Sequence, residues 1–358
     1  MTSWLRAWES PTAGSSNYKR FSAKAALELA SPSTWVASIG PCCIAGAFAL
    51  CSAMESGLAE AVSVQAGEAL GEGAGEGVGV LAEMGTVLDG RSALCWVLML
   101  LCAVLLQSAV NTLNDYQDFK SGLDTAETIR DETDASLVYN QINPRSALAF
   151  ALVLLGLAAA LGTAVVLLTS LWLLVPAAVA AAAVCLYSAG PKPISSLPLG
   201  EVVSGIVMGG VLTCVCFYAV TLSFSSAVVA LAVVPTVAIA QIMLTNNTCD
   251  TARDRAAGRR TLPLLLGVHR SRVLNGALGV FAFLWLGLFV VGEGLAPGLI
   301  VVLLGLALCL PKLATLLKGP YSLENRRVMM HSVVSYNRLL DASACVALLA
   351  GGVARAIF

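Results

Sequence analysis

The sequence contains little charge, and this scarcity excludes several classes of protein. Only 12% of its 358 residues are Asp, Glu, Lys or Arg, whereas 58% are hydrophobic. Soluble domains carry about a quarter charged residues, so this composition points to lipid as the surrounding solvent. The net charge of −1 leaves no basic stripe for a phosphate backbone, which argues against a nucleic-acid partner.

Metal-binding patterns built from His and Cys are also missing. The chain has two His and 11 Cys, and the Cys residues are scattered through apolar runs singly or as Cys42-Cys43 and Cys214-x-Cys216. None has the spacing with His that a zinc site needs. We interpret these Cys residues as small buried hydrophobic side chains.

What the chain does contain is a series of long apolar runs. A membrane-spanning helix needs about 20 mostly apolar residues. The runs predict an all-α membrane protein with nine transmembrane helices, at 34–54, 92–113, 146–168, 171–188, 202–222, 226–247, 273–292, 295–317 and 338–357. Residues 1–33 are polar and form an N-terminal segment, whereas residues 34–358 form one transmembrane domain.

The distribution of basic residues predicts how these spans are oriented. With a cytoplasmic N-terminus, all but two of the 21 Lys and Arg lie on the cytoplasmic side, and only Arg91 and Arg355 lie opposite. An excess of Lys and Arg in cytoplasmic loops is typical of membrane proteins. We therefore expect a cytoplasmic N-terminus and an outer C-terminus.

The loops on the two sides differ in length and polarity. The cytoplasmic connections 114–145, 189–201 and 248–272 are long and polar, so we expect the functional residues there. The outer connections are short, except for residues 55–90, which are rich in Gly, Ala and Glu. This composition predicts a flexible or weakly helical outer insertion without chemistry of its own.

The first polar segment of interest follows the second span. Asn111, Asp115 and Asp118 are spaced i, i+4, i+7, so they share one face if the helix continues. Like charges at this spacing repel each other unless a cation lies between them. Mg²⁺ is such a cation, because it takes oxygen ligands and commonly bridges to substrate phosphates.

A second segment of the same kind follows the sixth span, four helices later. Asn246, Asp250 and Asp254 are spaced by four residues and also share a face. A solvated acidic face would explain one such cluster, but two indicate a pseudo-repeated bundle that brings both to a central cavity. We therefore predict that four carboxylates hold Mg²⁺ on a diphosphate: Asp115, Asp118, Asp250 and Asp254.

Several other polar residues lie near these segments. The basic candidates to neutralise a diphosphate are Lys120, Lys192, Arg253, Arg255, Arg259 and Arg260. Because several must be ordinary positive-inside residues, we favour Lys120 together with Arg259 or Arg260. Tyr187 could pack against an isoprene chain or steady a cation. Gln107 and Gln241, inside the second and sixth spans, predict either interhelical hydrogen bonds or contacts to an acceptor.

The two acidic segments resemble the signature motifs of the UbiA superfamily of intramembrane prenyltransferases. The matching residues are Asn114-Asp115-x-x-Asp118 and Asp250-x-x-x-Asp254. The resemblance runs from about residue 26 to the C-terminus and excludes residues 55–90. It implies a bundle of nine spans with the termini on opposite sides, Mg²⁺ as cofactor and an isoprenoid diphosphate as substrate.

Longer strings are similar to the 1,4-dihydroxy-2-naphthoate prenyltransferases of menaquinone synthesis. They are Asn114-Asp115-Tyr116-x-Asp118-x-x-x-Gly122-x-Asp124, Tyr187-Ser-Ala-Gly190-Pro191-Lys192-Pro193, Gly200-Glu201, and Asn246-Asn247-x-x-Asp250-x-x-x-Asp254-x-x-x-Gly258-Arg259-Arg260-Thr261-Leu262. Together with the spacing, they imply these substrate-binding residues: Asn111, Asn114, Lys120, Asp124, Tyr187, Lys192, Asn246, Asn247, Arg259 and Arg260. One residue departs from the family pattern, because Ser31 precedes Pro32 where family members usually carry Arg.

This resemblance implies a transferase of alkyl or aryl groups. It would move a polyprenyl group from polyprenyl diphosphate to 1,4-dihydroxy-2-naphthoate, with loss of diphosphate and CO₂, to give demethylmenaquinol. Ionisation assisted by Mg²⁺ would form an allylic carbocation in a cavity shielded from water. A quinone pathway suits a plasma membrane with the active site at its cytoplasmic face, and nothing in the sequence indicates the oligomeric state.

Two alternatives remain open. A member of the same superfamily could act on another aromatic or tetrapyrrole acceptor. A secondary transporter would also contain repeats and intramembrane acids, but it would place the acids near the midplane. Here both acidic segments lie at one end of their spans, which favours the enzyme.

Overall fold

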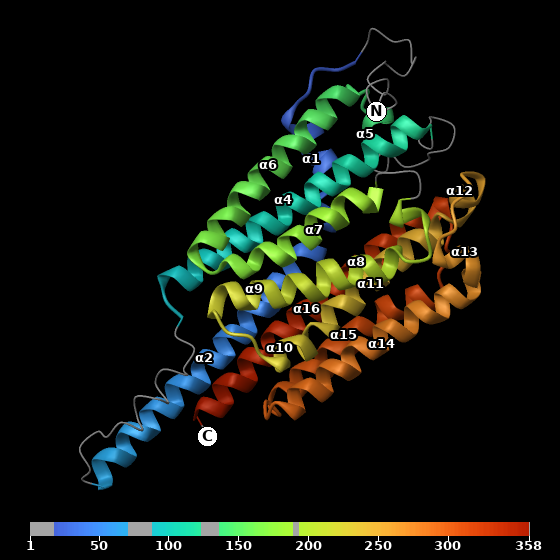
Figure 1. Cartoon of the computed structure of the whole chain (residues 1–358). Coiled ribbons are helices and arrows are strands. Elements are labelled where there is room, and N and C mark those ends of the chain that lie inside the picture. The colour runs from blue at the N-terminus through green and yellow to red at the C-terminus, as the bar shows by residue number, and fades with distance from the viewer. Residues whose placement is uncertain (1–17, 71–87, 123–135, 189–192, 358) are drawn as a thin grey trace.

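Nearly all of the described chain is helical. The computed structural model of the protein describes residues 18–70, 88–122, 136–188 and 193–357 (Figure 1). The one strand-like contact among these residues is an isolated bridge between Lys19 and Ile142. The prediction of an all-α protein is confirmed.

The helices of the described chain differ widely in length. Their bounds are α1 (Ala23–Ala30), α2 (Val36–Leu70), α4 (Gly90–Ser121), α5 (Ser136–Tyr139), α6 (Pro144–Leu168), α7 (Leu174–Ser188), α8 (Gly200–Ser204), α9 (Leu212–Thr221), α10 (Ser226–Leu231), α11 (Val233–Cys249), α12 (Thr251–Ala256), α13 (Leu262–Leu266), α14 (Val268–Gly292), α15 (Gly298–Lys318) and α16 (Arg326–Ile357). A π-helical stretch, Gly205–Val211, joins α8 to α9, so these three pieces form one span.

Eight helical segments of the described chain are long and apolar enough to cross a membrane. They are Val36–Gly57, Gly90–Lys120, Pro144–Leu168, Gly200–Thr221, Ser226–Cys249, Val268–Gly292, Gly298–Lys318 and Leu323–Ile357. Each coincides with one of the nine predicted spans. The remaining prediction, 171–188, corresponds to a shorter apolar helical segment, Leu171–Val184.

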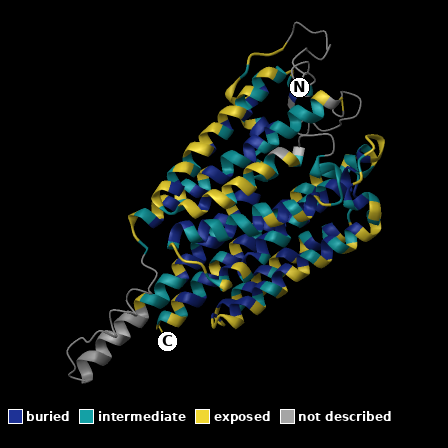
Figure 2. Cartoon of the chain, in the orientation of Figure 1, coloured by how far each residue is buried: buried dark blue, intermediate teal, exposed yellow. Residues whose placement is uncertain are grey.

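The outward faces of the helices carry large apolar side chains. Leu167, Trp172 and Leu288 are 77%, 76% and 68% exposed. Exposed residues follow the outer helices α6 and α14, whereas buried residues gather in the middle of the bundle (Figure 2). Water-soluble monomers rarely expose continuous apolar surface of this extent. The chain is therefore a multi-pass membrane protein.

Helix α2 lies at the centre of the bundle. In the most apolar stretch of its span, 67% is buried inside the bundle. The corresponding value for α6, which lies at the edge, is 28%. The Phe48 ring of α2 packs between Phe217 of α9 and Phe289 of α14, with ring centroids 5.4 Å and 5.6 Å apart. These aromatic contacts join helices from both halves of the chain.

A glycine allows the fifth and sixth spans to approach closely. A Cβ atom on Gly209 would lie 2.5 Å from the carbonyl group of Pro235, so no other residue fits there without a shift of the backbone. Small residues allow helices in membranes to pack backbone against backbone. This contact fixes the position of α11, whose other end carries the second acidic segment.

The end of the bundle opposite the acidic segments is held by two arginines. Arg91 donates hydrogen bonds to the carbonyl oxygens of Ala219 and Val220, at 3.1 and 2.9 Å, at the C-terminal end of α9. Arg355 pairs with Glu55 of α2 and donates to the carbonyl oxygen of Glu293 at 3.0 Å. Both cations complement exposed helix carbonyls. They are the two residues that the count of basic residues assigned to the outer side.

Helix α2 continues well beyond its span. It runs for 35 residues to Leu70, which corresponds to about 52 Å, whereas the hydrocarbon core of a bilayer is about 30 Å thick. The first part of the predicted insertion 55–90 is therefore helical and extends away from the bundle (Figure 1). Residues 71–87 lie outside the described part of the chain.

Candidate active site

The first acidic segment is helical, as its spacing predicts. Helix α4 continues past the apolar span to Ser121, and Gly122 ends it in the left-handed conformation with φ 73°. The Gly122 N–H donates to the carbonyl oxygens of Asp118 and Phe119, which caps the last turn. Asn111, Asp115 and Asp118 therefore share one face of α4.

Asn111 ties this face to the segment that joins α1 to α2. Its Nδ2 donates to Thr34 Oγ1 at 2.8 Å and to the carbonyl oxygen of Ala30 at 3.2 Å. Gln107, one turn earlier, donates to Asn111 Oδ1 at 3.2 Å, and its own Oε1 is buried without a hydrogen-bond donor in the described part of the chain. The segment that joins α1 to α2, residues 30–34, thus orients Asn111, a contact that the sequence alone did not indicate.

Ser31, the departure from the family pattern, lies in the same segment. It is the C-cap residue of α1 and adopts the left-handed conformation, with φ 48°. Its hydroxyl donates to the carbonyl oxygen of Glu28 at 3.2 Å, so the side chain is used to cap its own helix. Position 31 supplies no positive charge to the site.

The second acidic segment bends at Asp250 but keeps its helical spacing. Asp250 is the C-cap residue of α11, and α12 begins at Thr251. The N–H of Asp250 donates to the Asn246 carbonyl and that of Asp254 to the Asp250 carbonyl, at 3.1 and 2.9 Å. Both carboxylates are buried, 3% and 2% exposed, at the motif end of the bundle.

One guanidinium joins the two acidic segments. Arg259 Nη2 lies 2.8 Å from Asp118 Oδ1, and its Nη1 lies 3.3 Å from Asp254 Oδ1. Gly258, with φ 71°, turns the chain so that the Arg259 N–H donates to the Asp254 carbonyl at 2.9 Å. Thr261 Oγ1 donates to Asp254 Oδ2 at 3.3 Å. The structure therefore brings together two motifs that are 141 residues apart at Asp118 and Arg259.

Two further arginines hold Asp250. Arg253 Nη2 lies 3.1 Å from Asp250 Oδ2, and Arg326 Nε lies 3.3 Å from its Oδ1. Arg326 Nη2 also donates to Asn246 Oδ1 at 2.5 Å. The sequence analysis missed Arg326, which begins α16 and lies 76 residues after Asp250 in the chain. Its one signal in the sequence is a basic position at the start of the last span.

Burial dominates the electrostatics of the second segment. It raises the pKa of Asp250 to about 7, although Arg253 opposes this shift. Burial also raises the pKa of Asp254, against the lowering effect of Arg259 and then Arg253. Because burial disfavours the ionised form, both carboxylates carry their charge at a cost in free energy. A cation bound beside them would reduce this cost.

A buried glutamate lies beside the second segment. Asn247 Nδ2 donates to Glu201 Oε1 at 2.8 Å, and both side chains are buried. Glu201 is the second residue of α8, after Gly200, and the hydroxyl oxygen of Tyr187 lies 3.6 Å from the position that a Cβ on Gly200 would take. Gly200-Glu201 was part of the family resemblance, but its link to Asn247 appears only in the structure.

The other predicted site residues are more dispersed. Lys120 is exposed in the last turn of α4, and Arg260 is exposed with its N–H donating to the Ser196 carbonyl at 2.9 Å. Asn114 is half-buried on α4 beside Asp115. Asp124 and Lys192 lie outside the described residues. Gln241 donates to the carbonyl oxygen of Asn275 at 3.0 Å, which confirms the interpretation as an interhelical hydrogen bond.

The chemistry of this site fits a magnesium ion. Asp118 and Asp254, from two different motifs, already share one cationic group, and carboxylate oxygens are the ligands that Mg²⁺ prefers. Within the described ranges, no three His, Cys, Asp or Glu side chains form a closed metal cage. Mg²⁺ commonly uses one or two carboxylates together with substrate phosphates, and the carboxylates of Asp118 and Asp254 could supply such a pair.

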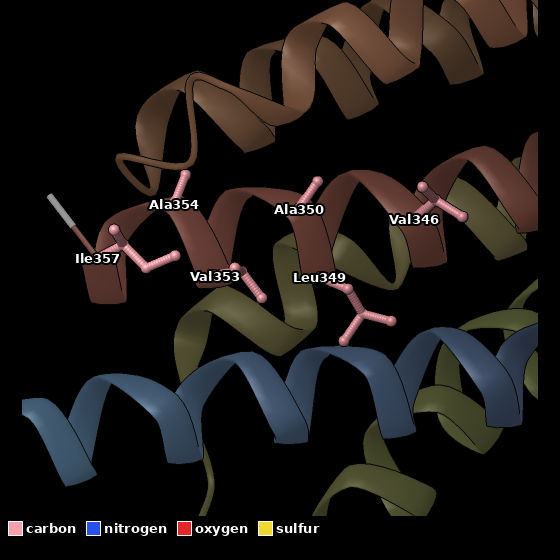
Figure 3. Close-up of a pocket in the computed structure, with 6 residues that line it drawn as sticks. All are labelled: Val346, Leu349, Ala350, Val353, Ala354 and Ile357. Carbon is pink, nitrogen blue, oxygen red and sulfur yellow. The ribbon is translucent and has the colours of Figure 1, made fainter.

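The apolar groove in Figure 3 is separate from this site. It has a volume of about 500 Å³ and is lined by α16 residues Val346, Leu349, Ala350, Val353, Ala354 and Ile357. These residues occupy the C-terminal end of α16, whereas Arg326 begins the same helix at the acidic segments. The groove offers no polar side chain for a diphosphate.

The chain is similar in sequence to curated proteins that act on a naphthoate. The 1,4-dihydroxy-2-naphthoate octaprenyltransferase of Bacillus subtilis (strain 168) is 32% identical over 259 residues, which cover 72% of this chain and 81% of that protein. The protein of the same description from Mycobacterium tuberculosis (strain ATCC 25618 / H37Rv) is 30% identical over 231 residues, 63% of this chain and 78% of that protein.

Solved structures share the fold. A UbiA homolog from Archaeoglobus fulgidus bound to GPP and Mg²⁺ aligns with a TM-score of 0.54 and 16% identity over 90% of this chain and 99% of that chain. A structure described as digeranylgeranylglyceryl phosphate synthase aligns with a TM-score of 0.54 and 18% identity over 91% and 98%. The model of the UbiA prenyltransferase family matches residues 78–334. With this match and the paired aspartate segments, the chain belongs to the UbiA prenyltransferase family.

Proposed function

We propose that this prenyltransferase moves a polyprenyl group from polyprenyl diphosphate to 1,4-dihydroxy-2-naphthoate. Diphosphate and CO₂ leave, and the product is demethylmenaquinol. The observation that carries the proposal is the guanidinium of Arg259, which joins Asp118 and Asp254 across the two halves of the chain. The acceptor is proposed from the relatives, whose descriptions name this naphthoate.

The acidic segments are suited to hold the diphosphate. Asp115, Asp118, Asp250 and Asp254 would hold Mg²⁺, which when bound neutralises the charge that develops on the leaving group. The chain adds its own cations to this region, since Arg253 and Arg326 flank Asp250 and Arg259 lies between Asp118 and Asp254. Guanidinium groups match phosphate oxygens in a bidentate manner, so they can exchange a carboxylate for the diphosphate when substrate enters.

Ionisation of the donor creates an allylic cation that water would destroy. The residues of α11 that precede Asp250 lie deeper in the span. Leu244 and Thr245 among them are fully buried, and the Thr245 hydroxyl donates to the carbonyl oxygen of Gln241. An apolar environment excludes water and leaves the aromatic acceptor as the available nucleophile. Tyr187 lies beside Gly200 at the same end of the bundle and would support the cation with its ring.

The orientation in the membrane follows from the same arrangement. The acidic segments share their end of the bundle with α1, whereas α16 ends at the other (Figure 1). We place the acidic end, together with residues 1–33, in the cytoplasm of a cell with a plasma membrane that contains quinones. The C-terminus is then outside, with Arg91 and Arg355.

The test is prenyl transfer by the purified protein in detergent. The assay contains Mg²⁺, a radiolabelled polyprenyl diphosphate, and either 1,4-dihydroxy-2-naphthoate or 4-hydroxybenzoate. We expect label in a decarboxylated naphthoquinol only with the naphthoate, and none after EDTA or in the Asp118→Asn, Asp250→Asn double variant. Transfer to 4-hydroxybenzoate alone would contradict the assignment of the acceptor but not the prenyl transfer. A folded protein that transfers no label to either acceptor would contradict the proposed reaction.

A further inference from the structure

Glu201 is a buried carboxylate with one oxygen unused. Its side chain is in the first turn of α8, and the residue is 3% exposed. Oε1 accepts the hydrogen bond from Asn247, whereas Oε2 is buried and has no donor among the described residues. A buried acceptor without a donor destabilises a protein, so a ligand that donates to Oε2 would bind with a gain in free energy.

The depth of Glu201 matches the place of an acceptor. Asn247 precedes Asp250 by three residues, which sets it about 4.5 Å deeper along the helix axis. Glu201, which accepts a hydrogen bond from Asn247, therefore lies about one helical turn from Asp250, one of the carboxylates proposed to hold the diphosphate. The reacting carbon of the donor is bonded to a diphosphate oxygen, and the ring carbon that attacks it must approach within about 3 to 3.5 Å. An acceptor ring that attacks a donor held in this way would lie at about the level of Glu201.

We propose that Glu201 Oε2 accepts a hydrogen bond from a hydroxyl group of the aromatic acceptor and thereby selects hydroxylated rings. This inference rests on the proposed function and names a specificity-determining residue for it. A hydroxyl is the matching group because the carboxylate of a naphthoate would be repelled by Glu201. The hydrogen bond to Asn247 fixes the orientation of Oε2, so the carboxylate is preorganised for this contact.

The competing roles for Glu201 are a metal ligand and a structural partner of Asn247. The substitution Glu201→Gln separates them, because the amide oxygen retains the bond from Asn247 while an NH₂ group replaces Oε2. A matched control is Glu28→Gln on α1, since Glu28 Oε2 accepts from Asn140 Nδ2 at 2.7 Å in a similar Glu–Asn pair. Glu28 is more exposed than Glu201 and also lies 3.8 Å from Lys24, so Glu28→Gln tests the effect of the same substitution outside the site, where both KM values should stay unchanged.

The experiment measures KM separately for donor and acceptor, and the affinity for Mn²⁺ by electron paramagnetic resonance. For Glu201→Gln we expect the acceptor KM to rise about tenfold or more, because hydrogen bonds to charged groups contribute that much. The donor KM, the Mn²⁺ affinity and the melting temperature stay as in the unsubstituted protein. An acceptor with its hydroxyls methylated provides a test without substitution, and the unsubstituted protein should discriminate against it more strongly than Glu201→Gln does.

The outcomes separate this inference from the proposed function. An unchanged acceptor KM in Glu201→Gln, or a loss of Mn²⁺ affinity with it, overturns the role of Glu201 while prenyl transfer stands. If Glu201→Gln does not fold, equal use of hydroxylated and methylated acceptors by the unsubstituted protein overturns it. An unsubstituted protein that transfers label to no hydroxylated aromatic acid overturns both.

Discussion

The ion pairs of Arg259 with Asp118 and Asp254 predict how much a substitution of Arg259 lowers the free energy of unfolding. Replacing Arg259 with Gln leaves the buried Asp254 carboxylate with Thr261 and leaves Asp118 without this cation. Breaking a fully buried ion pair costs about 3–5 kcal/mol and breaking an exposed one less than about 1 kcal/mol. Arg259 is 23% exposed and Asp254 2%, so we expect a loss of about 2 kcal/mol in the metal-free protein.

The assay is thermal unfolding in detergent at pH 8 with EDTA, as a double-mutant cycle. A loss of 2 kcal/mol corresponds to a decrease of roughly 3 °C in melting temperature for a chain of 358 residues. In an Asp254→Asn background, Arg259→Gln should cost about half as much, because only the pair with Asp118 remains. Mg²⁺ should then raise the melting temperature of Arg259→Gln more than that of the unsubstituted protein, since no internal cation competes. Equal losses in both backgrounds would refute the bridge.

Three further predictions follow from the same geometry. Arg326→Gln should raise the donor KM about tenfold and leave the acceptor KM unchanged, whereas Arg327→Gln, at an exposed neighbouring position, should change neither. Burial raises the pKa of Asp250 to about 7, so its ionisation in the fold costs stability as the pH rises through that value. Asp250→Asn removes this cost but also breaks the pairs with Arg253 and Arg326, so its melting temperature relative to the unsubstituted protein should be more favourable at pH 8 than at pH 5 in the metal-free state, and the opposite order would contradict the shift. Gly209→Ala should destabilise the protein by about 3 kcal/mol, because its Cβ meets the Pro235 backbone at 2.5 Å, whereas Gly156→Ala in open space should be neutral in the same melting assay.

The helices and their faces were predictable because they depend on local spacing. Apolar runs of about 20 residues identify spans, and an i, i+4, i+7 pattern predicts that Asn111, Asp115 and Asp118 share a face. The structure agrees on both points. Residues 171–188 are helical too, as Leu171–Leu173 followed by α7, but their apolar helical part is shorter than the eight long spans.

The partners of each charge were not predictable, since they depend on tertiary contacts. Six basic residues lay near the motifs in sequence, and nothing local distinguishes Arg259, which reaches both Asp118 and Asp254, from Arg260, which is exposed. Arg326 is a long way from Asp250 in the chain, so its contact follows only from the packing of α16 against α11. The free oxygen of Glu201 likewise depends on Asn247, which lies 46 residues away.

The two arginines that hold the end opposite the motifs have a consequence for synthesis of the chain. Arg91 and its acceptor on Ala219 are 128 residues apart, and Arg355 and Glu55 are 300 apart. A ribosome adds about 5–20 residues per second, so the first contact waits roughly 6 to 25 seconds after Arg91 is made. Helices α2 and α4 are therefore synthesised before the residues that Arg91 and Glu55 contact. A chain that stalls shortly before residue 355 would contain the contact of Arg91 but lack that of Arg355, so this end of the bundle would be held by one arginine instead of two.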